Sequence, residues 1–429
     1  MKKSILFAIT LLILAGCHKP ENPEPRCNTK IADWLYGVEY EDYDFAALVD
    51  LMSEFYEPGA AACSEVRKGN FVGRNFDWFI NDQASAIIKI DAKDPAHASD
   101  LEYVNTARYA SIAVVGNCAQ FTKDVAESGR WNDAYTLLPM YVMDGINEKG
   151  LYVGINVAPT GETSFDPSKW ESYAWGLGAA YTNPSSPYKY GDGLLNRFLL
   201  DHAASVDEAV ELIKKVNWYD LVGIEIPDAA QSFIWMISDA KKNCVMEFIE
   251  NTPVFLITEN VAEASTSTVM TNFSNAIYQE GIIQDSGSGY ERFQTALEYY
   301  PSTPATADGM RSMMKRLWYS QVYTTKQKTP GFRYSDIIPD GVSMRDFFND
   351  PSLKDDQDIV DYIDLAQQLF VSREDWHSPD NLMWYSTHTS VYDLRAKTLS
   401  VFLHEGLDGD TRWYDFSQSV SFAKPFAGR

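Results

Sequence analysis

Cys63 heads the stretch CSEVRKGNFVGRNFDWF, in which a cysteine is followed by an arginine and an aspartate. The stretch predicts a hairpin whose turn includes Gly69 and one adjacent residue, because glycine adopts the positive φ of tight turns without steric cost. Pairing about such a turn places Cys63 opposite a residue between Arg74 and Phe76, so Arg74 and Asp77 come within roughly 5 to 8 Å of it. A guanidinium lowers the pKa of a nearby thiol, and a carboxylate can orient a protonated neighbour. The spacing therefore predicts a reactive cysteine.

A cysteine that carries a free α-amino group can act as a nucleophile without a histidine. The α-amine has a pKa of roughly 7.7 to 8 and the thiol one of about 8.5, so the amine can serve as the base. None of the six histidines lies in a recognisable pairing motif. A disulfide or a buried inert thiol is the alternative for Cys63. The cluster of His377, His388, Asp375 and Asp380 lacks metal-ligand spacing, and we expect neither metal nor cofactor.

Four short motifs occur in an order that resembles one enzyme family. They are GRNFD at Gly73–Asp77, NEKGL at Asn147–Leu151, VMTN at Val269–Asn272 and ERF at Glu291–Phe293. In this order they resemble the Cys-type N-terminal-nucleophile hydrolases of the choloylglycine hydrolase family, which includes bile salt hydrolases, penicillin V acylases and acid-ceramidase-like amidases. The closing stretch TSVYDLRAKTLSVFLHE fits the same family. The resemblance covers most of the chain from Cys63 onward.

The resemblance implies a role for each residue of the hairpin. Cys63 would be the nucleophile, and Arg74 would hold its thiolate and contact the acyl side of the substrate. Asp77 would accept a hydrogen bond from the Cys63 amine. Asn75 and Trp78, on the same predicted strand, are interpreted as structural residues.

Two asparagines and a second arginine complete the site that the resemblance implies. Asn272, which ends VMTN, would stabilise the oxyanion of acyl transfer, where the loss of one donor typically costs about 10² to 10³ in rate. Asn156, in GINVAP, would be a second donor, although its spacing from NEKGL is one residue short. Arg292, in YERF, would support the electrostatics of the site.

The N-terminus predicts export and a lipid anchor. Residues 1–16 carry two lysines and a short apolar run, which indicate a signal peptide, and the ending LAGC is a bacterial lipobox. Cleavage would leave Cys17 lipidated, with residues 17–30 as a tether to the membrane. We therefore expect a cell-envelope lipoprotein, in the outer membrane or periplasm. A signal peptide cut at another bond is the alternative.

Residues 31–62 separate the tether from the hydrolase domain, which we predict at residues 63–429. The nucleophile must then be unmasked by a second cut, at Ala62-Cys63. Acid-ceramidase-like members cleave themselves before the cysteine and retain the released piece. The resemblance implies that residues 31–62 are a propeptide, cut from the hydrolase domain in the same autocatalytic way.

The charge composition limits the classes of partner that the protein is expected to bind. The chain of 429 residues has 36 basic and 60 acidic residues, a net charge of −24, which argues against binding to nucleic acid or to an anionic membrane surface. A homo-oligomer is left open. The five cysteines are at positions 17, 27, 63, 118 and 244, and a bridge between Cys118 and Cys244 competes with free buried thiols.

Periodicity predicts an α+β fold, and the resemblance implies a four-layer αββα sandwich. Strands dominate from 63 to about 120, a hairpin crosses Glu148-Lys149-Gly150, and a helix pair follows near 193–216. Further strands are expected at 232–257 and a helix near 290–300. Helices are also expected near 45–55 and 359–370, and residues 316–386 are interpreted as an insertion.

These features together predict an amidohydrolase that cleaves a linear, non-peptide C–N bond through a thioester on Cys63. Candidate substrates are conjugated bile salts, penicillin V-like compounds, and N-acyl amino acids or amines. The alternatives are an acyltransferase of the penicillin-biosynthetic type, an acid-ceramidase-like N-acyl lipid hydrolase, and a lipid-anchored binding protein whose cysteine is inert.

Overall fold

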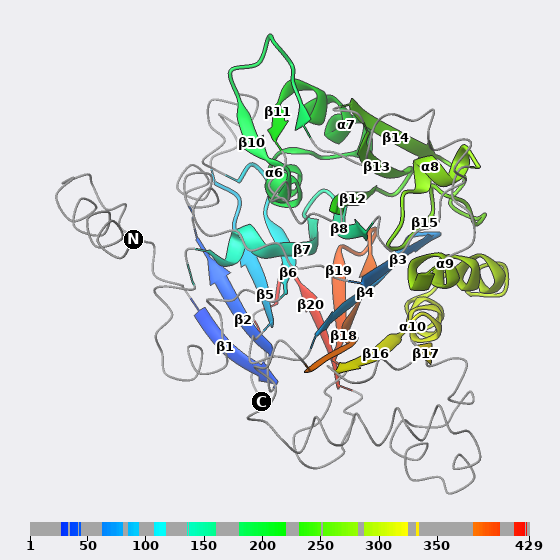
Figure 1. Ribbon diagram of the computed structural model, residues 1–429. Coiled ribbons are helices and arrows are strands. Elements are labelled where there is room, and N and C mark those ends of the chain that lie inside the picture. Colours follow the sequence, from blue (N-terminus) through cyan, green and yellow to red (C-terminus); the bar gives the residue numbers. More distant parts are fainter. Residues whose placement is uncertain are drawn as a thin grey trace, which may run out of the picture.

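The structure is a computed structural model that describes residues 27–32, 35–41, 43, 62–79, 85–93, 107–116, 135, 137–159, 180–219, 231–249, 252–281, 287–324, 332–333, 381–403, 416–424 and 426. In this part of the chain, two large sheets pack face to face, with helices outside them (Figure 1). None of the helices described is long and apolar enough to cross a membrane.

The first sheet, sheet A, has nine strands among the described residues. Its central hairpin is the one predicted across Glu148-Lys149-Gly150, and Gly150 has a φ of +89° at that turn. In spatial order the strands are β1 (Cys27–Ala32), β2 (Leu35–Tyr40), β5 (Ser85–Ile90), β6 (Ser111–Val115), β7 (Val142–Asn147), β8 (Tyr152–Pro159), β12 (Gln231–Ser238), β13 (Asn243–Ile249) and β14 (Thr252–Thr258).

The second sheet, sheet B, contains the hairpin that begins with Cys63. The order along it is β15 (Val269–Met270), β3 (Ala62–Lys68), β4 (Phe71–Phe79), β18 (Asn381–Asp393), β16 (Tyr319–Thr324) and β17 (Phe332–Arg333). β19 (Thr398–Leu403) also pairs with β18, and β20 (Phe416–Ser421) pairs with β19. A small third sheet joins β10 (Lys189–Gly191), β11 (Asn217–Tyr219) and β9 (Ala180–Tyr181).

Helices cover the outer face of each sheet. Sheet A packs against α6 (Leu195–His202) and α7 (Val206–Lys215), and short 3-10 turns lie at Leu138–Tyr141 and Asp192–Leu194. Ser205 caps α7 by accepting from the Glu208 amide, as its S-x-x-E sequence predicts. Sheet B packs against α9 (Gly287–Tyr299) and α10 (Ala307–Arg316), and α8 (Asn275–Gln279) follows β15.

Three apolar clusters fill the spaces between these layers. The first joins the outer face of sheet A to α6 and α7, and the third joins the outer face of sheet B to α9 and α10. The second lies between the sheets, with Ile112 and Ile234 from sheet A meeting Val72 and Val401 from sheet B. The layers are therefore helix, sheet, sheet and helix, which confirms the predicted αββα sandwich.

Among the described residues, regular structure begins inside the segment that the sequence predicts to be a tether. We expected a tether through residue 30 and a separate propeptide after it. β1 begins at Cys27, before the predicted tether ends, and β2, within the predicted propeptide, pairs in parallel with β5 along its whole length. Apolar side chains at Leu35 and Val38 are fully buried, which makes a strand inside the sheet more favourable than an exposed linker.

Some sequence predictions fall on residues outside the described ranges. These include the signal peptide, the lipobox and the helices expected near 45–55 and 359–370. The two ends of the proposed insertion, 316–386, are strands of sheet B, since β16 and β18 pair with each other. Cys244 is a free, buried thiol, which decides against its bridge to Cys118.

Candidate active site

Cys63 is the second residue of β3 and lies opposite Phe76 of β4, within the predicted window. The hairpin turns at Gly69 and the residue after it, and Gly69 has a φ of +59°. The Cys63 side chain is 1% exposed. Arg74 Nη2 donates to its sulfur at 3.5 Å. The expected closeness of Cys63 and Arg74 is therefore confirmed.

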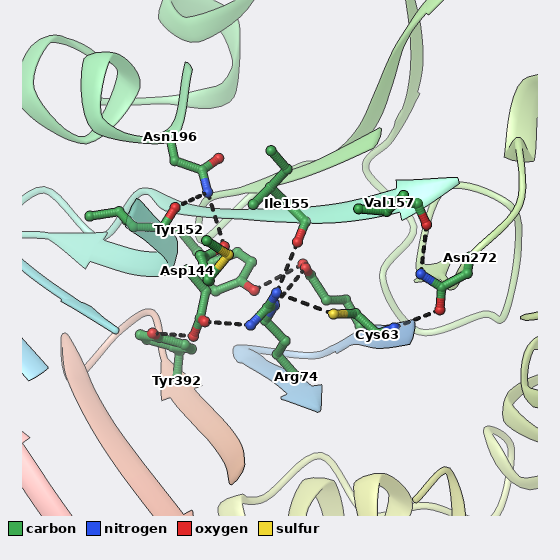
Figure 2. A network of polar contacts seen from close by, with 12 residues as sticks. Cys63, Arg74, Asp144, Tyr152, Ile155, Val157, Asn196, Asn272 and Tyr392 are labelled. Atoms are coloured by element: carbon green, nitrogen blue, oxygen red, sulfur yellow. Dashed lines mark hydrogen bonds and ion pairs between the residues drawn. The ribbon is translucent and has the colours of Figure 1, made fainter. Parts of the chain in front are cut away.

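Arg74 reaches across the space between the sheets and is held there by several acceptors (Figure 2). Its Nη1 pairs with Asp144 Oδ1 of β7 at 2.8 Å, and its Nε pairs with Glu65 Oε1 of β3 at 3.2 Å. Its Nη2 also donates to the Ile155 carbonyl of β8 at 2.9 Å. These contacts fix the plane of the guanidinium, so that one nitrogen faces the sulfur of Cys63.

Asp77 lies on the opposite face of the same hairpin, because side chains three residues apart on a strand point to opposite sides. It meets Arg292 of α9, whose Nη1 is 2.6 Å from Asp77 Oδ2. Ser386 of β18 donates to the other carboxylate oxygen. Asp77 and Arg292 are both fully buried. This face of the hairpin therefore contains a closely matched ion pair.

Asn272 connects the two faces at the backbone of Cys63. Its Oδ1 accepts from the Cys63 backbone nitrogen at 2.5 Å and from Arg292 Nη2 at 2.5 Å. Its Nδ2 donates to the Val157 carbonyl of β8 at 2.6 Å. The sequence analysis expected Asp77 to accept from the Cys63 nitrogen. With Ala62 joined to Cys63, Asn272 holds that nitrogen instead, and Arg292 links Asn272 to Asp77.

The loop that carries Asn272 is supported from sheet A. Glu247 of β13 accepts from the Ala276 amide at 3.1 Å and from the Ser274 hydroxyl, at the start of α8. Ser274 in turn accepts from the Ile277 amide and caps the helix. Glu247 thereby anchors the loop two residues beyond Asn272.

Asn156 contacts the residues that surround Arg74, and its role as an oxyanion donor stays a prediction. The amide orientation that satisfies both of its polar atoms has Nδ2 donating to Glu65 Oε1 and to the Ile155 carbonyl, each at 3.0 Å. These contacts place Asn156 in the Arg74 network rather than at Asn272. Val157, one residue further on, is the one that contacts Asn272. Asn156 alternates with Tyr152 and Gly154 along β8, so its side chain shares their face and points toward Glu65 between the sheets.

Burial and charge set the protonation state of the Cys63 thiol. Burial raises the pKa of the Cys63 thiol to about 12, although Arg74 and Arg292 act to lower it. The intact chain therefore holds a protonated thiol at neutral pH. Catalysis needs a base within reach, and the α-amine released by a cut at Ala62-Cys63 would be one.

The acids around the nucleophile are also shifted toward their neutral forms. Burial raises the pKa of Glu65 to about 8, against the opposing effect of Arg74, and it raises the pKa of Asp144. Burial raises the pKa of Asp77 to about 6, against the opposing effect of Arg292. Shifts of this kind are common at functional sites.

Several residues of this site were not predicted. Tyr152 donates to Glu65 Oε2 at 2.9 Å, and Tyr392 donates to Asp144 Oδ2 at 2.6 Å. Glu65 could have been found from its position two residues after Cys63, since alternate residues of a strand share a face. Asp144 and Ser386 come from distant strands, and no local signal marks them.

The contacts of Asn75 and His388 are those of residues that stabilise the fold. Asn75 donates to the Met314 carbonyl at 2.8 Å and accepts from Thr389 at 2.7 Å, in line with its predicted structural role. His388 stacks on Phe76, with ring centroids 5.1 Å apart. Burial lowers the pKa of His388 to about 3, so this imidazole is neutral.

Comparison with known proteins finds one family model that matches part of the chain. The family model for acyl-coenzyme A:6-aminopenicillanic acid acyl-transferase matches residues 134–329, a segment that contains Asn156, Asn272 and Arg292. No curated protein matches the chain.

Solved structures show weaker likenesses. Penicillin V acylase from Agrobacterium tumefaciens has a TM-score of 0.41 at 14% identity, over 80% of this chain and 82% of that one. A mutant of conjugated bile acid hydrolase from Clostridium perfringens has a TM-score of 0.39 at 16% identity, over 84% and 92%. At these values the likenesses carry no argument about activity. The match of the family model over residues 134–329 supports the resemblance drawn from the motifs, and the chain is similar to enzymes of the choloylglycine hydrolase and penicillin acylase family.

Proposed function

We propose that this protein hydrolyses the linear, non-peptide amide bond of a small N-acyl compound through a thioester on Cys63. The observation that carries the proposal is the way Cys63 is held from two sides. Its sulfur lies 3.5 Å from Arg74 Nη2, and its backbone nitrogen lies 2.5 Å from Asn272 Oδ1. Once the preceding bond is cut, that nitrogen becomes an α-amine beside the thiol it has to deprotonate.

In the first half-reaction, the α-amine of Cys63 takes the proton of the thiol, and the sulfur attacks the carbonyl carbon of the amide. The C–S bond forms as the carbonyl becomes an oxyanion, which the Asn272 amide is proposed to stabilise. Collapse of this intermediate breaks the C–N bond. The protonated α-amine gives its proton to the leaving amine. Arg74 favours the thiolate before the attack.

In the second half-reaction, water replaces the amine. The α-amine removes a proton from the water, whose oxygen attacks the thioester carbonyl, and the C–S bond breaks. The acid leaves, and the thiolate recovers its proton from the α-amine. Asp77 and Arg292 hold Asn272 in place throughout, through the contact between Arg292 Nη2 and Asn272 Oδ1 at 2.5 Å.

The mechanism requires a cut at Ala62-Cys63, which we propose is made by Cys63 itself. The sulfur attacks the Ala62 carbonyl, the acyl group moves from nitrogen to sulfur, and water hydrolyses the resulting thioester. The segment before the cut is proposed to remain bound, because β1 and β2 belong to sheet A. Tyr43 beyond β2 also donates to Asp201 of α6.

Two pieces should therefore copurify and separate only on denaturation. Intact-mass analysis under denaturing conditions should show a species that begins at Cys63, and native mass spectrometry should show both pieces together. Cys63→Ala should abolish turnover and the cut, and Cys63→Ser should leave at most trace activity. Active protein that is uniformly uncut would rule out the free-amine mechanism.

The substrate class is proposed from the resemblance of the motifs, and not from the shape of a binding pocket. Candidates are conjugated bile salts, penicillin V-like compounds, N-acyl amino acids or amines, and N-acyl lipids. The net charge of −24 disfavours anionic substrates unless Arg74 and Arg292 compensate locally. A panel of glycine and taurine conjugates, penicillin V, ceramide and N-acyl amino acids tests the proposal. The absence of Cys63-dependent hydrolysis of every member would contradict it.

Acyl transfer is a second candidate, because the family model that matches this chain is that of an acyltransferase. Both reactions pass through the same thioester and differ only in whether water or an amine accepts the acyl group. The assay is to add a primary amine to a turnover mixture and to measure the ratio of new amide to free acid. Amide formation that exceeds hydrolysis at low millimolar amine would favour the transferase.

Envelope location is proposed from the lipobox and the lysines before it. Mass analysis of the N-terminal fragment should find a lipid on Cys17. Cys17→Ala should release the protein from membranes without altering turnover. A soluble wild-type protein with an unmodified Cys17 would contradict the anchor.

A further inference from the structure

Glu65 is a fully buried carboxyl that lies two residues after the nucleophile and directly opposite Arg74. Cys63 and Glu65 alternate along β3, so both point into the space between the sheets, where Arg74 also points. Glu65 Oε1 is 3.2 Å from Arg74 Nε. It therefore contacts the one guanidinium nitrogen nearest the stem of the side chain.

The surroundings of Glu65 are built to hold a carboxyl. Tyr152 donates to Oε2 at 2.9 Å, and the Asn156 amide donates to Oε1 at 3.0 Å. Gly154, between these two residues on β8, leaves the necessary room. A Cβ there would lie 2.5 and 2.6 Å from the two carboxyl oxygens of Glu65. Each of these features comes from sheet A, so the carboxyl is clamped between the sheets.

The guanidinium is tied at three edges. Asp144 holds Nη1 at 2.8 Å and Ile155 holds Nη2 at 2.9 Å, while Glu65 holds Nε. The Nε contact decides how the plane rotates about the side-chain stem. If it were lost, Nη2 could turn away from the sulfur of Cys63, 3.5 Å distant. A misplacement of about 1 Å at such a site can cost 10²-fold in rate.

We propose that Glu65 is a positioning residue, which fixes the Arg74 guanidinium against the sulfur of Cys63 and sets how the thiol responds to pH. The proposal rests on the proposed function, in that it assigns to Cys63 the role of nucleophile. Glu65 itself acts on the sulfur through Arg74.

The pH response follows from the charges that face Glu65. They are Arg74 from β4, Asp144 from β7 and the Cys63 thiol on its own strand, with Tyr152 of β8 as a neutral donor. Arg74 thus faces three acidic groups, namely Glu65, Asp144 and the Cys63 thiol. As a neutral acid, Glu65 still accepts from Arg74. When it ionises above a pKa of about 8, it competes with the thiolate for that cation and raises the pKa of the thiol.

The test is the rate at which iodoacetamide alkylates Cys63, followed by peptide mass spectrometry from pH 6.5 to 9.5. It uses the purified full-length protein and the variants Glu65→Gln and Glu65→Ala. Gln keeps an oxygen for Arg74 Nε but cannot ionise. Its rate should stay within about threefold of wild type at pH 7, and the ratio to wild type should rise about five- to tenfold by pH 9.5. Ala should lower the rate about tenfold or more at pH 7.

Glu211→Gln is the matched control, because that side chain is 64% exposed on α7 and its rate should follow wild type. Tyr152→Phe keeps every charge but removes one hydrogen bond to Glu65, and it should show a smaller loss than Ala. These two variants and Gln decide the matter if Ala fails to fold. A Gln profile parallel to wild type, or an Ala rate equal to wild type, would overturn the proposal.

The same preparations are assayed on the amide panel. If alkylation responds to Glu65 as expected and no amide is hydrolysed, the proposed function fails while the positioning role stands. If amides are hydrolysed and alkylation is indifferent to Glu65, the positioning role fails alone.

Discussion

The two faces of the hairpin that carries Cys63 balance charge in different ways. On the face between the sheets, Arg74 meets Glu65, Asp144 and the Cys63 thiol. On the face toward α9, the ion pair is one to one, between Asp77 and Arg292. Both faces are almost fully buried. Because buried charge is stable only when it is paired, the first face must keep some of its acids protonated.

The comparison shows how one strand pair separates two tasks. The face between the sheets influences the ionisation of the Cys63 thiol through Arg74, and the face toward α9 holds the Cys63 backbone nitrogen through Asn272. Alternation of side chains along β4 sends Arg74 and Asp77 to opposite sides, although they are only three residues apart. A change on either face should therefore produce a different kind of defect.

The largest effect is expected for Arg74→Ala. It removes the cation that donates to the Cys63 sulfur and takes the counter-charge from Glu65 and Asp144, which keep only neutral donors such as Tyr152 and Tyr392. We expect kcat/KM to fall by about 10³-fold or more, with a loss of stability of about 3 kcal/mol reduced by protonation of the two acids. Steady-state kinetics measure the fall in kcat/KM, and thermal unfolding measures the loss of stability. An Arg74→Ala enzyme with near-normal kcat/KM would contradict the assigned site.

Asp77→Asn should be the next largest. The side chain keeps its shape and one oxygen, but Arg292 loses its counter-charge and can draw Asn272 away from the Cys63 nitrogen. We expect a loss of about 10²- to 10³-fold in kcat, with the alkylation rate of Cys63 changed less than in Arg74→Ala. The cut at Ala62-Cys63 should also slow. Equal losses of alkylation in both variants would mean that the two faces are not separate.

Local sequence accounts for more of this hairpin than for its partners. The turn at Gly69, the pairing of Cys63 with Phe76, and the approach of Arg74 all follow from residues within the hairpin. The strands and helices with clear periodicity were also predicted, among them β6 and α7. These are interactions that short-range spacing can fix.

The rest depends on contacts between distant segments. Asp144 reaches Arg74 only because sheet A packs on sheet B, and no spacing in the sequence encodes that registry. Asn156 points into the space between the sheets, but its contact with Glu65 depends on the same packing of sheet A on sheet B. The strands β1 and β2 were not predicted within the tether and propeptide segments, because the hydrogen bonds of β2 are made with β5, which is distant in the sequence.

The pH dependence of stability distinguishes the two faces. A carboxyl whose folded pKa is raised contributes stability that is present below its unfolded pKa and lost as pH rises through the folded value. For Asp77 that loss is complete near pH 6, whereas for Glu65 it continues to about pH 8. His388, whose pKa is lowered from 6.5 to about 3, changes the stability only below pH 6.5, outside this range.

Between pH 6.5 and 8.5 the wild-type Tm should therefore fall, by roughly 3 °C. Glu65→Gln should remove much of that slope, and Asp77→Asn should leave it in place. Burial raises the pKa of Glu247 to about 7, so this residue should account for the part of the fall in Tm that remains near pH 6.5 to 7. Scanning calorimetry across this range measures the slopes. A Tm that is flat in wild type would contradict the assignment of neutral acids to the face between the sheets.

The smallest effect is expected where the two faces are joined, at the support of the Asn272 loop. Glu247→Gln keeps an oxygen for the Ala276 amide but exchanges the second oxygen for a donor that faces the Ser274 hydroxyl. We expect about 1 kcal/mol of lost stability and a fall of a few-fold in kcat, because α8 and the loop can shift slightly while Asn272 keeps its contacts. Ser274→Ala, which removes the same hydroxyl together with the cap of α8, should give a similar change. KM should stay near wild type in both, since the loop is argued to hold the oxyanion donor rather than the ground-state substrate. A change in KM with unaltered kcat would place this loop in substrate binding instead.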